Sequence, residues 1–147
     1  MKRLSILAIL MAAFLIAERM VFAQTGDDVS TYRACALCGM DRGQFSYSRM
    51  LIKYKDGTIT AFCSLHCAAI NLAKHIDQTP ILIQVGDYNS RRLINAESAF
   101  WVVGGKRPGV MSKTGTWAFE KKGEAEGFLK TNLGQLATFQ DALKAAH

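Results

Sequence analysis

Apolar residues in this chain fall into short runs that turn-forming residues separate. Such runs, rich in Val, Ile, Leu, Phe and Trp, are typical of buried β-strands. Lys55, Asp56 and Gly57 stand between the first two runs, and an Asp-Gly pair in that place indicates a β-hairpin. The pattern predicts strands over residues 50–54, 58–62, 81–85, 99–103, 117–119 and 136–139, with a short extended segment at 91–95.

Helical spacing of apolar residues begins after Ser64, where leucine and alanine recur every three or four positions. Serine is a favoured N-cap, so the sequence predicts a helix from about Ser64 to His75. The same spacing predicts a second helix over about 122–132 and a helical tail over 140–147.

The order of the predicted elements contains a faint internal repeat. A strand, a helix and a strand follow one another around Phe62 and again around Phe119. We therefore expect an α+β fold with two related strand–helix–strand units and short antiparallel sheets, the first unit treble-clef-like. These units cover about 35–88 and 89–147 of a single domain, residues 35–147.

The N-terminus has the pattern of a secretory signal. Lys2 and Arg3 precede the uncharged, mostly apolar run 4–17, and Ala23 ends a small-residue cleavage site. We expect a cleavable signal peptide over 1–23, an exported or periplasmic protein, and a flexible polar leader at 24–34. The alternative is an uncleaved N-terminal segment, the one route by which we expect the chain to contact a membrane.

Charge argues against nucleic acid as a partner. The whole chain carries a net charge of +6, and removal of residues 1–23, with three basic residues and one acidic, leaves about +4. The basic residues of the mature chain are scattered and predict a solvated face, whereas a nucleic-acid site needs a dense basic stripe. No phosphate loop, nucleophile elbow or paired carboxylates are present, so the sequence does not predict an enzyme.

All four cysteines lie in two tight pairs, Cys35-x-x-Cys38 and Cys63-x-x-x-Cys67. Thiolates are soft ligands that favour Cu(I), zinc or iron–sulfur centres over hard cations. The second pair falls at the start of the predicted helix, where the helix dipole makes a thiolate easier to form. His66 stands inside this pair and is a further candidate ligand.

Three uses of the cysteines compete. Four thiolates can hold a structural Zn(II), as in a treble-clef interaction module. Cu(I) also accepts thioethers, and both Met40, beside the first pair, and Met111, in a Gly/Pro/Ser loop, offer one. Alternatively, Cys35 and Cys38 form a thiol–disulfide couple. Cu(I) is the leading prediction, with Zn(II) as the alternative.

The chain resembles the NosL family of nitrous oxide reductase accessory proteins. The resemblance rests on an ordered set of motifs: Cys35–Met40, Val85–Tyr88, Ala99–Gly104, Gly109–Ser112, Trp117–Phe119 and Glu124–Phe128. It implies a periplasmic Cu(I)-binding protein of two related α+β units that delivers copper to a client enzyme or its assembly factors. The motif positions of the family correspond to Cys38, Met40 and Met111.

Two features depart from that family. NosL proteins are typically lipoproteins, but no cysteine lies near position 23. The segment 62–67 instead resembles TRASH-like treble-clef metal modules. The resulting set of expected metal ligands is Cys35, Cys38, Met40, Cys63, His66, Cys67 and Met111.

Overall fold

The computed structural model describes residues 28–146. The chain divides into a unit of residues 1–31, of which only the short helix α2 (Asp28–Thr31) is described, and a compact unit of residues 32–147. The predicted signal peptide, residues 1–23, lies outside the described part. Among the described residues, no helix has the length and apolar character that crossing a membrane requires.

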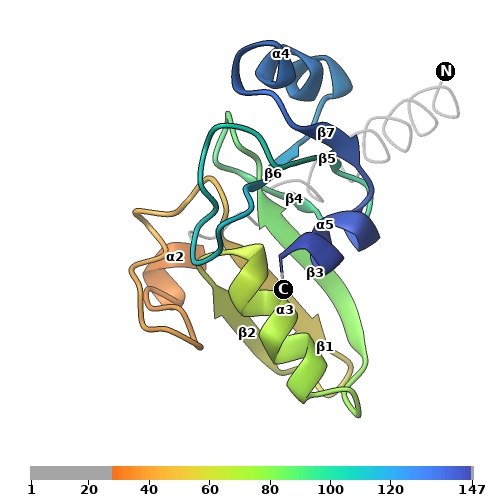
Figure 1. The fold of residues 1–147 in the computed structure, drawn as a ribbon. Coiled ribbons are helices and arrows are strands. Elements are labelled where there is room, and N and C mark those ends of the chain that lie inside the picture. Colours follow the sequence, from red (N-terminus) through yellow and green to blue (C-terminus); the bar gives the residue numbers. More distant parts are fainter. Residues whose placement is uncertain (1–27, 147) are drawn as a thin grey trace, which may run out of the picture. The chain divides into compact units, whose positions relative to one another are not determined.

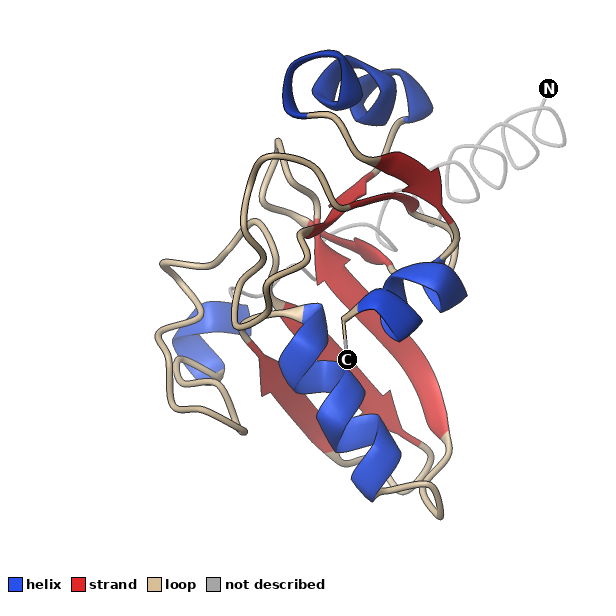
Figure 2. Cartoon of the chain, viewed as in Figure 1, coloured by secondary structure: helices blue, strands red, loops and turns tan. Residues whose placement is uncertain are grey.

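The compact unit contains two small antiparallel sheets with helices (Figures 1 and 2), which confirms the predicted α+β class. The first sheet has the order β2-β1-β3-β4 and the second has the order β6-β5-β7. The strands are β1 (Met50–Tyr54), β2 (Ile59–Phe62), β3 (Pro80–Gly86), β4 (Leu93–Asn95), β5 (Phe100–Val103), β6 (Thr116–Phe119) and β7 (Gln135–Ala137). The helices are α3 (Leu65–Lys74), α4 (Lys122–Asn132) and α5 (Phe139–Ala145).

The predicted internal repeat is visible in the strand order. In the first half, β1, β2, α3 and β3 follow one another, and the strands are arranged β2-β1-β3. In the second half, β5, β6, α4 and β7 follow one another, and the strands are arranged β6-β5-β7. Both halves are therefore one antiparallel ββαβ pattern in which the first strand is central.

The first hairpin and its helix form where the sequence predicts them. Gly57 adopts a left-handed φ of 89°, which the turn requires and glycine allows, and the Asp56 carboxylate accepts a hydrogen bond from the Thr58 N–H. After β2, the Ser64 hydroxyl caps α3 by accepting the N–H of Cys67 at 3.5 Å. This capping sets the direction in which α3 leaves the sheet.

The prediction of a strand over 136–139 is wrong at its end. Thr138 is the N-cap of α5, and Phe139 is the first residue of that helix. Thr138 and Asp141 form a reciprocal capping box, with the threonine hydroxyl accepting the Asp141 N–H and the carboxylate accepting the Thr138 N–H. This local hydrogen bonding outweighs the strand preference of Phe139.

Alternate faces of the second sheet belong to different apolar clusters. Trp101 and Val103 join the larger cluster, to which α3 and α5 contribute, as Phe139 packs its ring 5.9 Å from that of Trp101. Val102 and Trp117 join the smaller cluster under α4. Because α5 contacts both α3 and the second sheet, the two halves share one continuous core.

Candidate metal site

The four cysteine sulfurs converge on one point. All four Sγ atoms lie within 4.8 Å of one another, at the N-terminal end of α3. The Sγ–Sγ distances are 3.5 Å for Cys38–Cys63, 3.7 Å for Cys63–Cys67 and 3.8 Å for Cys38–Cys67. All four thiols are free. The structure thus brings together two pairs that the sequence separates by a hairpin.

A tight loop, the knuckle of residues 35–40, positions the first pair. The N–H of Cys35 donates to the carbonyl of Met40, and the N–H of Gly39 donates to the carbonyl of Cys35, each at 2.9 Å. Gly39 has a left-handed φ of 77°, which closes this loop without strain because glycine has no Cβ. The Ala36 N–H donates to the carbonyl of Ala61, so the knuckle is fastened to β2.

The end of β2 and the start of α3 position the second pair. Cys63 follows the last residue of β2, and Cys67 lies in the first turn of α3, four residues later. Their Sγ atoms lie 3.7 Å apart, so both side chains point to the same side. The Ser48 hydroxyl donates a hydrogen bond to the carbonyl oxygen of Cys63 at 2.9 Å, which fixes the junction between β2 and α3.

A buried arginine connects the segment before the knuckle to the hairpin strands β1 and β2. Its burial contradicts the prediction that the basic residues form a solvated face. Arg42 is fully buried and donates to the carbonyl oxygens of Tyr32, Phe62 and Met50 at 2.5, 3.1 and 3.2 Å. Arg49 is also buried, and donates to backbone carbonyls away from the cysteines. No sequence signal separates these two arginines from the exposed ones.

Proximity of the thiols shifts their acidity in opposite directions. Hydrogen bonds from Cys63 and Cys67, with smaller contributions from backbone N–H groups, lower the pKa of Cys35 far below its usual value. Hydrogen bonding to Cys35 and to Cys67, together with burial, raises the pKa of Cys63. Hydrogen bonding to Cys35 raises the pKa of Cys67 to about 12. Because a thiol binds a metal as the thiolate, binding of an ion at this site releases protons.

The sulfur spacing fits one ion bound by four thiolates. A tetrahedral site with metal–sulfur bonds of about 2.3 Å has sulfur–sulfur edges of about 3.8 Å. Three of the edges here, those among Cys38, Cys63 and Cys67, are 3.5–3.8 Å and are close to that length. The convergence of four sulfurs, rather than of Cys35 and Cys38 alone, suits a metal better than a thiol–disulfide couple.

The remaining predicted ligands are Met40, His66 and Met111, which lie in three different segments of the chain. Met40 packs against the cluster that contains the buried cysteines. His66 directs Nδ1 to the carbonyl oxygen of Ala146 at 2.5 Å, so any metal bond would fall to its Nε2. Met111 is 46% exposed with a left-handed φ of 65°, while its neighbour Val110 packs against the cysteine-containing cluster.

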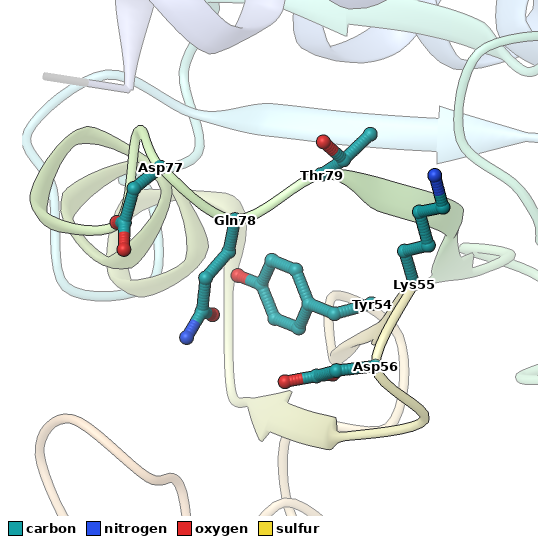
Figure 3. Close-up of a pocket in the computed structure, with 6 residues that line it drawn as sticks. All are labelled: Tyr54, Lys55, Asp56, Asp77, Gln78 and Thr79. Carbon is teal, nitrogen blue, oxygen red and sulfur yellow. The ribbon is translucent and has the colours of Figure 1, made fainter.

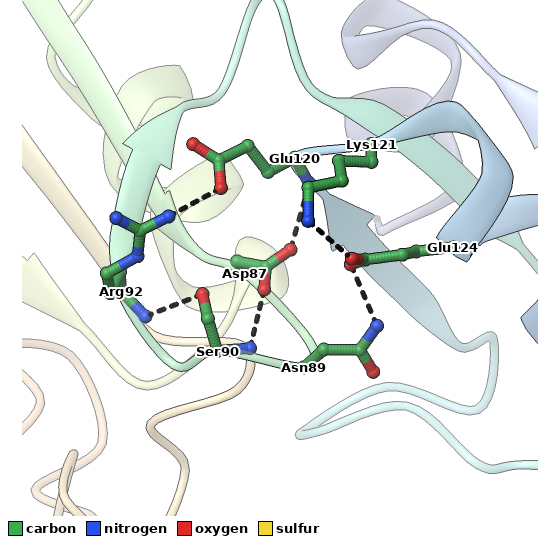
Figure 4. Close-up of polar contacts among 7 residues, drawn as sticks. All are labelled: Asp87, Asn89, Ser90, Arg92, Glu120, Lys121 and Glu124. Carbon is green, nitrogen blue, oxygen red and sulfur yellow. Dashed lines mark hydrogen bonds and ion pairs between the residues drawn. The ribbon is translucent and has the colours of Figure 1, made fainter.

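Asp87, which the sequence indicates only as a turn residue, is a buried junction between the halves. Its carboxylate accepts the N–H groups of Ser90 at 2.6 Å and Glu120 at 2.8 Å (Figure 4). Burial acts to raise the pKa of Asp87, but hydrogen bonds from Ser90, Glu120 and Asn89 outweigh it, and the pKa lies below its usual value. The carboxylate is thus already used in holding the fold.

One pocket lies at the far end of the first hairpin, between the hairpin turn and the segment after α3 (Figure 3). Its volume is about 340 Å³. The lining residues are Tyr54, Lys55, Asp56, Asp77, Gln78 and Thr79, all with oxygen or nitrogen side-chain groups. This pocket includes none of the predicted soft ligands.

Comparisons with known proteins agree with one another. The NosL family model matches residues 27–146. The crystal structure of the copper chaperone NosL from Shewanella denitrificans is similar, with a TM-score of 0.59 and 26% sequence identity, over 74% of this chain and 87% of that one. No curated protein matches the chain.

Proposed function

This chain belongs to the NosL family, and we propose that it is a metallochaperone that binds Cu(I) after export to the periplasm. It passes the ion to a copper enzyme, such as nitrous oxide reductase, or to the assembly factors of that enzyme. The convergence of four cysteine sulfurs within 4.8 Å carries this proposal, and the similar structure of a copper chaperone supports copper as the metal. The ion is cargo, so the role is not enzymatic.

Cys38, Cys63 and Cys67 are the principal ligands in this proposal. Their sulfurs form a triangle with edges of 3.5–3.8 Å, into which one soft ion fits. Cys35 is the fourth thiolate, and Met40 is a neighbouring thioether.

Met111 and His66 are secondary ligands of the cargo ion. The exposed side chain and left-handed backbone of Met111 suit a thioether that closes over the ion and is later given up to an acceptor. His66 is the second residue of α3, beside Cys67, and its Nε2 is the ring nitrogen that remains for an ion because Nδ1 faces the carbonyl oxygen of Ala146.

Export is tested on the full chain produced with its own N-terminal segment. We expect mature protein in the periplasmic fraction, with a mass that corresponds to cleavage after Ala23. An uncleaved chain recovered from the membrane fraction would contradict the signal peptide and favour an N-terminal anchor. This measurement also sets the start of the mature chain. We place the start of the domain at residue 35, after a polar leader.

Metal binding is tested by anaerobic titration of the reduced protein with Cu(I) against a competing chelator. We expect one tightly bound ion, with affinity reduced at least about 100-fold in Cys38→Ser, because a hydroxyl is a poor ligand for a soft ion. Met40→Leu and Met111→Leu should weaken binding less. Met50→Leu is the matched control, since Met50 is a fully buried core residue and should leave the affinity unchanged. Unchanged affinity in Cys38→Ser would overturn the proposal.

A structural Zn(II) site is the second candidate. The near-tetrahedral sulfur spacing and the burial of Cys35, Cys63 and Cys67 favour it, because structural zinc sites are closed and have four protein ligands. This function predicts zinc retained through purification, unfolding on chelation and no effect of either methionine substitution. The same titration, repeated with Zn(II), therefore separates the two functions.

A further inference from the structure

Access to the four sulfurs is strongly one-sided. Cys63 and Cys67 have no exposed surface and Cys35 is 4% exposed, whereas Cys38 is partly exposed. Among the four cysteines, Cys38 is therefore the one past which an incoming ligand can reach an ion at this site. Since Cys38 lies in the knuckle, the knuckle is the face at which the ion enters and leaves.

The surface around Cys38 is apolar and uncharged. We call the exposed residues Ala36, Leu37 and Gly39 the knuckle tip. Leu37 is 38% exposed, and the space beside Gly39 is open, since a Cβ there would meet no atom within 4 Å. Small residues beside a protruding leucine let another backbone approach closely and offer it one apolar contact.

The two charged residues that flank the knuckle in sequence do not alter that character. Arg33 and Asp41 flank the knuckle, and the guanidinium donates to one carboxylate oxygen from Nε at 3.0 Å and from Nη2 at 2.7 Å. This pair neutralises both charges next to the tip. A partner that docks here is therefore recognised by an apolar contact and not by electrostatic attraction.

We propose that the knuckle tip is the docking face for a metal acceptor that presents a thiolate or thioether from an apolar surface. Leu37 supplies the docking contact, and Cys38 is the ligand that is exchanged. In the transfer step, the sulfur of the acceptor binds the ion with its electron pair, and the bond from the ion to Cys38 breaks, which leaves Cys38 as a thiolate. Cu(I) keeps its oxidation state throughout. This inference rests on the proposed function and adds the partner's chemistry to it.

The test measures the rate at which the full protein, loaded anaerobically with Cu(I), gives its ion to two synthetic peptides. Both peptides carry two cysteines, flanked by leucines in one and by serines in the other. We expect transfer to the leucine-flanked peptide to be about five-fold faster, as one partly buried leucine contact allows. Leu37→Ser should remove this preference and leave equilibrium Cu(I) affinity within two-fold, whereas Leu37→Met should retain it.

Leu136→Ser is the matched control, because Leu136 on β7 is similarly exposed, at 42%, but lies outside the knuckle. Equal rates for the two peptides, or the same loss in Leu136→Ser, would overturn the inference while leaving Cu(I) binding intact. A Leu37-dependent dimer of the loaded protein in sedimentation would assign the face to a second copy and also overturn it. A protein that binds no Cu(I) would overturn the proposed function itself.

Discussion

Replacing Arg42 by methionine tests how the two cysteine pairs are held together. The buried guanidinium donates to the carbonyl groups of Tyr32, Met50 and Phe62. Tyr32 precedes the first cysteine by three residues, and Phe62 immediately precedes the third. One side chain thus ties the segment before the knuckle to both strands of the hairpin that leads to α3.

The cost of this substitution follows from the hydrogen bonds that are lost. Methionine fills much of the volume of Arg42 but donates nothing, so three carbonyl oxygens lose a charged donor. A hydrogen bond to a charged group contributes about 1.5–3 kcal/mol. Removing a buried charge also removes its desolvation penalty, which offsets part of this loss. We expect a net loss of about 3 kcal/mol, a large share of the 5–15 kcal/mol typical of a domain.

The assay is urea unfolding of the reduced, metal-free protein, followed by metal titration, with Arg49→Met as the control. Arg49 is buried and donates to the carbonyls of Ser46 and Arg91, so its loss should also destabilise the fold. Only Arg42→Met should lower metal affinity, by at least about ten-fold, the size seen when support of a metal ligand is removed. A stability loss below about 1 kcal/mol in Arg42→Met, or equal metal affinities in the two variants, would refute this reasoning.

Three further substitutions test single features of the fold and site. Asp87→Asn should cost about 2 kcal/mol, because an amide can accept at only one of the two positions. The folded pKa of Asp87 lies below the usual 3.8, so the stability that the carboxylate contributes is complete above about pH 5 and is lost as the pH falls below 4. Urea unfolding should therefore show the stabilities of the wild-type and Asp87→Asn proteins converging in acid. A difference that stays constant with pH would contradict this. Ser64→Ala should lower the urea midpoint by an amount equivalent to about 1 kcal/mol, by removing the cap of α3, while Ser64→Asp restores it. Gly39→Ala should cost about 1 kcal/mol, because alanine is strained at the left-handed φ of this position although there is space for its Cβ. It should also weaken metal binding, measured by chelator competition. An unchanged affinity would show that the knuckle tolerates reshaping.

The convergence of the cysteines could be predicted because it depends on local signals. The Asp-Gly turn fixes the hairpin, and the hairpin returns the chain from the knuckle to Cys63. Ser64 starts the helix and places Cys67 one turn later. Each step involves neighbours in sequence, so periodicity and turn chemistry are enough to indicate it.

Features that depend on distant parts of the chain could not be predicted in this way. Arg42 stands in a polar stretch typical of a surface, and its burial depends on carbonyl groups of three separate segments. Asp87 follows a strand and resembles an ordinary turn residue, but the N–H of Glu120, 33 residues later, completes its role. The strand prediction for Phe139 is wrong for the opposite reason: the signal is local, but the capping box uses Asp141, a shorter acid than the usual Glu.

Comparison of the two halves explains why only the first offers a soft-metal site. Cys63 and Cys67 stand one and five residues after β2, and Glu120 and Glu124 stand at the same offsets after β6.

The carboxylates of the second half are hard ligands with partners of their own. Glu120 pairs with Arg92 at 2.6 Å, and Glu124 contacts Lys121 at 3.2 Å and Asn89 at 2.9 Å (Figure 4). The same strand-to-helix geometry therefore places paired carboxylates in the second half and gathers thiols in the first. The repeated backbone supplies the position, whereas sulfur at the helix start and a second sulfur pair in the knuckle supply the chemistry.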